Sequence, residues 1–168
     1  MRGDSSTLAL SFTALVTCFL VESSAQPQAA AEASDDQIVA VLAPELGAAS
    51  VLTMQDLTDE QIDNIGTETG LGWRFNGDFN SDGQPDLALL GSYRRAEGRG
   101  SFVLFASRQA TAWRRSGLVQ FPRPLIIGRA YNDALFVWFC TGCDSGGRIV
   151  WTSAGYEFVP FPPPGVPE

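Results

Sequence analysis

A fifteen-residue stretch, 77–91, most constrains what this chain can fold into, because it spaces oxygen-bearing side chains around a glycine. These side chains stand at loop positions 1, 3, 5 and 9: Asp78, Asn80, Asp82 and Asp86. A hard cation such as Ca²⁺ takes about six to eight oxygen ligands from a backbone that curls round it. Gly83, at position 6, permits the sharp turn that residues with a Cβ resist, and the carbonyl of Gln84 can supply a further oxygen. The stretch therefore predicts a Ca²⁺ site. The alternative is a polar turn without metal, but in such a turn the three converging acids would repel one another.

The same stretch does not predict an EF-hand. That motif requires a bidentate Glu at position 12, where this chain has Leu89, and it requires a helix on each side. The incoming segment, 70–77, contains three glycines, which disfavour a helix. The outgoing segment, 87–90, is a short apolar run between Pro85 and Gly91 and predicts a buried strand.

The pattern Asp-x-Asx-x-Asp-Gly-x-x-Asp followed by an apolar strand resembles the calcium loop of the FG-GAP/VCBS repeat family. That family is known from the β-propeller of integrin α subunits and from many secreted bacterial proteins. The resemblance implies a metal held by four side chains and one backbone carbonyl, those of Asp78, Asn80, Asp82, Asp86 and Gln84 respectively. The chain has one such loop and no Gly-Ala-Pro element, so we expect a lone blade-like sheet and not a full propeller.

The N-terminus predicts a secretory signal peptide. An apolar run, 8–21, follows Arg2 and precedes small residues that end at Ala25, where a signal peptidase would cut; an alternative cut follows Ala33. No other run is long enough to span a bilayer, so we expect a secreted or periplasmic protein with no transmembrane segment after signal removal. The predicted organisation is a signal peptide, a linker, one domain and a proline-rich tail: 1–25, 26–33, 34–159 and 160–168.

Composition excludes several classes of function. Cutting after Ala25 leaves 143 residues (168 − 25) with no His and no Lys, and a net charge of −7 after the loss of Arg2, Asp4 and Glu22 from a chain of charge −8. Without His, the usual general base is missing. Net acidity and export argue against a nucleic-acid partner. We expect a non-enzymatic protein.

The remaining patterns predict an α+β domain in which N-terminal helices pack on an antiparallel β-sheet. Capping boxes that begin at Ser34 and Thr58 predict a helix over 35–43 and a short second helix. Nine acids lie between Glu32 and Glu68, and we interpret them as solvated helix faces; the alternative is an acidic docking surface. Runs rich in aromatic and β-branched residues predict strands, with 92–100 as a turn-rich connection and 134–139 paired with 148–151. The predicted strand segments are 72–75, 87–90, 101–106, 112–121, 125–127, 134–139, 148–151 and 155–159.

Arginine and tryptophan each permit two interpretations. Nine of the ten mature arginines lie in the second half, where we expect them to decorate turns and outer strand faces and to pair with the acidic helices; the alternative is an anion-binding face. The tryptophans are interpreted as packing residues, and the alternative is a sugar-stacking platform. They are Trp73, Trp113, Trp138 and Trp151.

Cys140 and Cys143 form a Cys-x-x-Cys motif. Two cysteines left in an exported protein usually pair, so we predict a disulfide, with free thiols or thiol-disulfide redox chemistry as alternatives. Redox motifs of this kind begin a helix, whereas this one follows a predicted strand and enters the turn residues 144–147.

Together these features predict an exported calcium-binding domain whose metal is chiefly structural. Its partners would be the calcium ion and another protein or a glycan at the cell surface. Two alternatives stay open. An adhesion or carbohydrate-binding module would expose at least two coplanar Trp rings, and a Cys-x-x-Cys redox protein would place an accessible cysteine at a helix N-terminus.

Overall fold

The fold is described by a computed structural model over residues 33–65, 70–96, 98–125, 127–140 and 145–162. The described residues belong to one compact unit, 32–168. The predicted signal peptide, nearly all of the linker, Cys143 and the end of the tail lie outside the described residues. Among the described residues, no helix combines the length and the apolar character needed to cross a membrane.

The described residues of this unit form two antiparallel sheets of five strands each. In the first sheet the strand order is β1-β4-β5-β6, and β3 pairs with the same strand, β4, beyond the end of β1. The second sheet has the order β10-β9-β8-β7-β2. The bounds of the first sheet's strands are β1 Ala48–Val51, β3 Arg74–Gly77, β4 Asp86–Arg95, β5 Gly98–Gln109 and β6 Ala112–Phe121. Those of the second are β2 Leu71–Gly72, β7 Ile127–Tyr131, β8 Ala134–Trp138, β9 Gly146–Thr152 and β10 Gly155–Pro160.

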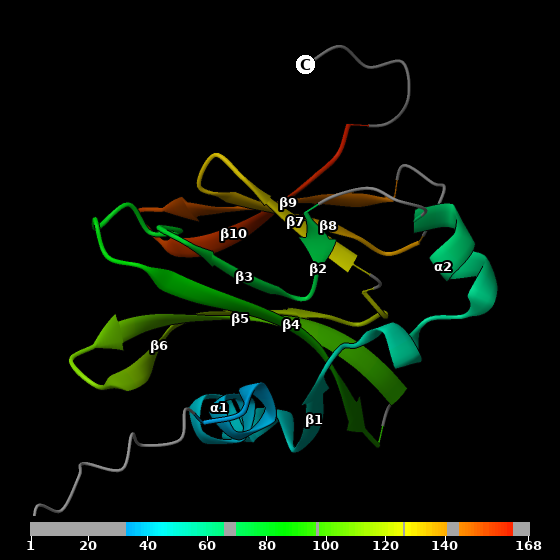
Figure 1. Ribbon diagram of the computed structural model, residues 1–168, viewed down its shortest axis with the longest axis horizontal. Helices are drawn as coiled ribbons and strands as arrows, with labels where there is room; N and C mark the ends of the chain where they lie inside the picture. The colour runs from blue at the N-terminus through cyan, green and yellow to red at the C-terminus, as the bar shows by residue number, and fades with distance from the viewer. Residues whose placement is uncertain (1–32, 66–69, 97, 126, 141–144, 163–168) are drawn as a thin grey trace, which may run out of the picture. The chain divides into compact units, whose positions relative to one another are not determined.

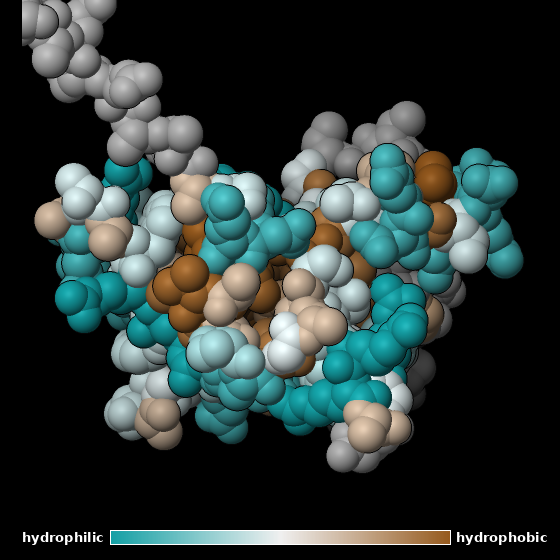
Figure 2. All heavy atoms as spheres, turned by 90° about the horizontal axis from the view of Figure 1, so that it is seen from below, coloured by the Kyte–Doolittle hydropathy of each residue, from teal (hydrophilic) through white to brown (hydrophobic). Residues whose placement is uncertain are grey.

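Helix α1, Asp35–Leu42, lies on the face of the first sheet that points away from the second sheet (Figure 1). Its predicted capping box is confirmed: Gln37 N donates to Ser34 Oγ at 3.3 Å, and Ser34 N donates to Gln37 Oε1 at 2.9 Å. The buried side chains of Ile38 and Val39 pack against the sheet. Seen from this side, hydrophobic side chains gather near the middle of the face and hydrophilic ones border them (Figure 2).

The second predicted helix is also present as α2, Asp59–Ile65. Its capping box joins Thr58 and Gln61 in the same reciprocal way, at 2.9 and 3.2 Å. Two short 3-10 turns, η1 Pro44–Leu46 and η2 Met54–Asp56, flank β1 in the sequence.

Strands β4 and β5 are buried on both faces. Side chains alternate between the two faces of a strand, so Ala88 and Leu90 lie in the core between the sheets. Leu87 and Leu89 lie in a second cluster under α1. Because both sides of β4 are covered, its sequence is a continuous apolar run, and the predicted buried strand is confirmed.

The predicted antiparallel sheet with N-terminal helices is confirmed in outline, but the single sheet was wrong, because the strands divide into two sheets. The hairpin connection predicted over 92–100 lies in this segment but is shorter than predicted: β4 continues to Arg95 and pairs with β5, which begins at Gly98. The ring of Tyr93 lies over its cross-strand partner Gly100, where a Cβ would stand 2.4 Å from the ring carbon Cζ. Glycine there signals close packing of an aromatic ring and not a turn.

Candidate metal centre

The predicted calcium loop connects β3 to β4 as a hairpin. Gly77, the last residue of β3, pairs with Asp86, the first residue of β4, so residues 78–85 form the connection. The predicted strand after the loop is confirmed. The strand predicted over 72–75 is divided: β2 ends at Gly72 in the second sheet, and β3 begins at Arg74 in the first. The helices of an EF-hand are absent from these described flanks.

Asp78 curls the loop around its own carboxylate. Its Oδ1 accepts a hydrogen bond from Asp82 N at 3.0 Å, and its Oδ2 accepts one from Gly83 N at 2.9 Å. The turn needs left-handed backbone at Ser81, with φ 58°, and at Gly83, with φ 79°. Glycine tolerates that conformation and most other residues resist it, so the structure supplies the physical reason for the glycine at position 6.

Asn80 and Asp82 close the inside of the loop. Asn80 Oδ1 accepts from Asp82 N at 3.0 Å, and Asn80 Nδ2 donates to Asp82 Oδ2 at 3.0 Å. Asp82 Oδ1 accepts from Gln84 N at 2.8 Å. Asp78 and Asn80 therefore share the Asp82 N–H as a donor, and the side chains of Asn80 and Asp82 contact each other.

Asp86 lies at the base of the loop and is fully buried, with 0% of its surface exposed. Its Oδ2 accepts from Phe79 N at 3.1 Å, and its Oδ1 accepts a short hydrogen bond from the Ser107 hydroxyl on β5. Burial raises the pKa of Asp86, the bond from Ser107 opposes the rise, and the charge of Asp82 adds to it. A buried carboxylate beside another carboxylate is costly without a cation.

Two hydroxyls that sequence reasoning missed lie near the loop. Tyr156 on β10 stacks on Phe105, with ring centroids 3.8 Å apart. Burial raises the pKa of Tyr156; the Ser116 hydroxyl opposes the rise, and the charges of the three loop acids add to it. The Tyr156 and Ser116 hydroxyls are nevertheless both buried without a partner at hydrogen-bond geometry. No local signal could have found them, because they come from β10 and β6.

These residues fit a hard cation in their chemistry. Asp78, Asn80 and Asp82 are joined by hydrogen bonds within the loop, and Asp86 lies buried at its base. In the described part of the chain none of the three loop acids forms a salt bridge, so their charge is offset only by N–H and O–H donors. The carboxylates are spread along the loop: over the described residues, no three Asp, Glu, Cys or His groups stand close enough together to hold a metal ion.

The other candidate site residues predicted from the sequence are the cysteines and the tryptophans. Cys140 follows β8 and is disulfide-bonded, whereas its predicted partner Cys143 lies outside the described residues. Of the tryptophans, Trp151 is the exposed one, at 43%, and no two of the described Trp rings stack on each other. The pair of coplanar exposed Trp rings required by the sugar-platform alternative is therefore not formed by the described residues.

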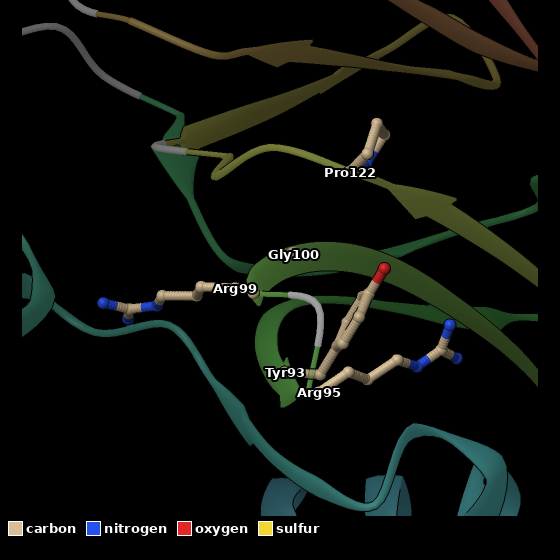
Figure 3. A pocket seen from close by; sticks show the side chains of 6 residues that line it. Tyr93, Arg95, Arg99, Gly100 and Pro122 are labelled. Carbon is tan, nitrogen blue, oxygen red and sulfur yellow. The ribbon is translucent and has the colours of Figure 1, made fainter.

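A hollow of about 320 Å³ lies at the β4–β5 hairpin and is lined by Tyr93, Arg95 and Arg99, among others. Figure 3 shows the two arginines extending to opposite sides of Tyr93. Arg95 donates to Gln120 Oε1 at 2.9 Å, and Arg99 lies 3.8 Å from an oxygen of Asp56. Since both guanidinium groups already have partners and point apart, they do not converge on one small anion.

The chain was compared with protein-family models, with curated proteins and with solved structures, and no match was found in any of the three comparisons.

Proposed function

We propose that this protein is an exported calcium-binding domain, non-enzymatic, in which the metal chiefly stabilises the fold. The observation that carries the proposal is the curled loop, in which both oxygens of Asp78 accept N–H groups from Asp82 and Gly83. Each carboxylate oxygen has two lone pairs, so the bonds that shape the loop leave a lone pair on each oxygen for a cation.

Five residues would hold the ion: Asp78, Asn80, Asp82 and Asp86 through their side chains, and Gln84 through its carbonyl. A bound Ca²⁺ supplies two positive charges that offset the mutual repulsion of the loop acids. Asp86 would couple the ion to the core, because its carboxylate also accepts hydrogen bonds from Phe79 N in the loop and from the Ser107 hydroxyl on β5. The likeness to an FG-GAP/VCBS blade is proposed for the β3–loop–β4 hairpin alone.

Export supports a structural metal. The predicted signal peptide directs the chain to compartments where a disulfide at Cys140 persists. Extracellular calcium modules bind with dissociation constants of about 10⁻⁴ to 10⁻³ M. A site of such affinity would stay occupied wherever free Ca²⁺ exceeds these concentrations, which suits a stabilising ion better than a signalling one.

Thermal melting tests the proposal. With Ca²⁺ at about a hundred times the dissociation constant, binding should raise the free energy of unfolding by about 2.7 kcal/mol. For a domain of this size, that raises Tm by roughly 10 °C. The comparison is with the same protein in a chelator. Asp82→Ala removes a ligand and should abolish the shift. Asp133→Asn, in the exposed β7–β8 turn, is the matched control and should keep the shift. Equal melting of the wild type with and without Ca²⁺ would overturn the proposal.

A further inference from the structure

The outer face of the second sheet carries a row of arginine and aromatic side chains. Phe136 on β8 stands opposite Arg129 on β7 and opposite Arg148 on β9. Residues opposite one another in a sheet point to the same side. The neighbours of Phe136, Leu135 and Val137, are buried in the core between the sheets, so Phe136 and both arginines face outward.

Two more rings extend this row into an aromatic surface. Trp138 stacks beside Phe136 with ring centroids 6.4 Å apart, and Phe161 lies 6.2 Å from Phe136 on another side. Phe161 reaches this position because residue 146 is glycine, where a Cβ would stand 2.9 Å from the Phe161 ring. A groove of about 360 Å³, lined by Phe136, Arg148 and Phe161 among others, opens here. Neither α1 nor α2 lies over this face (Figure 1).

The two arginines are available for a ligand. Both are exposed, and neither makes a hydrogen bond or ion pair with another residue that the structure describes. The acid nearest in register, Glu157, stands opposite Val150 and not opposite Arg148. Elsewhere in the described chain, arginines pair with acids of the N-terminal segment: Arg74 with Asp35, Arg99 with Asp56 and Arg115 with Glu45.

We propose that this outer face binds an acidic polysaccharide, a chain of uronic acid units. Aromatic rings present the flat apolar surface on which the C–H face of a sugar ring packs. A guanidinium group matches a carboxylate with two parallel hydrogen bonds. Arg129 and Arg148 lie two strands apart, or about 10 Å, so they would meet the carboxylates of alternate sugars while Phe136 lies under the sugar between them.

The row decides between ligand classes. A neutral glycan gives the two unpaired arginines no partner, and an acidic peptide offers no flat ring face to the aromatic row. The protein as a whole carries a net charge of −8, so a polyanion is repelled elsewhere and bound through this local positive face. The inference does not depend on the calcium loop, which lies between β3 and β4 of the other sheet.

Calorimetric titration of the full chain tests the inference, with short oligogalacturonate as the acidic probe and its fully methyl-esterified form as the neutral probe. A chelator is present throughout, so that Ca²⁺ cannot bridge protein and glycan. We expect the acidic oligomer to bind more tightly than the methyl ester, and we expect its affinity to fall as salt is added. Arg129→Gln and Arg148→Gln should each weaken binding roughly tenfold, the loss of one charge-assisted contact.

The matched control is Arg114→Gln, an exposed arginine on β6 of the first sheet, which should bind as the wild type does. Phe136→Leu keeps an apolar side chain but removes the ring, and it should weaken binding while Tm stays close to that of the wild type. Equal binding of the methyl ester, unchanged binding in both arginine variants, or no binding of the acidic oligomer would overturn the inference. Binding of polyglutamate as tightly as oligogalacturonate would overturn it too, in favour of an acidic peptide.

Discussion

Asp86 is the residue on which the loop and the core meet. It is buried, it accepts hydrogen bonds from Phe79 and Ser107, and it lies within the electrostatic field of Asp82. A carboxylate in this environment favours either a proton or a cation. The spacing of the loop predicted that Asp86 closes the site, but Ser107 stands on β5 and could not be found from local pattern.

The raised pKa of Asp86 predicts how stability depends on pH without metal. A folded-state pKa above the ordinary 3.8 means that the folded protein holds this proton more tightly than the unfolded chain does. The protonated Asp86 side chain therefore contributes to the free energy of unfolding. This contribution is fully present below about pH 3.8 and is lost as the pH rises through the folded-state pKa. Urea unfolding in chelator over a pH series should show this loss in the wild type.

Asp86→Asn keeps the size of the side chain but cannot ionise, so this loss of stability with rising pH should disappear from its pH profile. Asp133→Asn is the control for removing one exposed acid. If the stability of the wild type and of Asp86→Asn changed with pH in parallel, ionisation of the buried carboxylate would cost no folding free energy, which would contradict this prediction.

At the scale of single elements, the sequence predicted the regular segments well where local chemistry determines them. The capping boxes at Ser34 and Thr58 and the apolar run 87–90 each formed the expected helix or strand. It failed where a distant partner decides the outcome. Strand β1 is a short, partly exposed run whose strongest feature is its pairing with β4. Strands β4 and β5 extend into the segment 92–100, to Arg95 and from Gly98, where Tyr93 packs across Gly100.

Gly91 in the middle of β4 gives a test of this packing. A Cβ there would stand 2.2 Å from the Phe102 ring and 2.5 Å from the carbonyl oxygen of Ser50 on β1. Gly91→Ala should therefore destabilise the protein by about 1–3 kcal/mol, the usual cost of overpacking a core. Urea unfolding measures it. The double variant Gly91→Ala/Phe102→Leu should lose less stability than the sum of the losses in the two single variants, because the smaller side chain makes room for the Cβ. Unchanged stability in Gly91→Ala would contradict this packing.

At the scale of the whole described unit, β4 and β5 connect two hydrophobic cores. One core lies between the sheets and the other lies under α1, and each takes alternate residues of the same two strands. The second sheet could not be predicted from sequence, because strands that alternate apolar and polar residues pair equally well in one sheet or in two. Among the described residues, three ion pairs join arginines of the strands to acids of the N-terminal segment. The opposite charges of the two halves predicted such pairing for Arg99 and Arg115, but not which acids they would meet.

The central claim is that the loop between β3 and β4 binds one calcium ion, and calorimetric titration of the full chain with CaCl₂ in metal-free buffer tests it most directly. The account predicts one ion per chain, with a dissociation constant of about 10⁻³ M or lower. It also predicts loss of binding in Asp78→Ala and retention in Asp133→Asn. No binding by the wild type up to about ten times that concentration, or equal binding by Asp78→Ala, would contradict it.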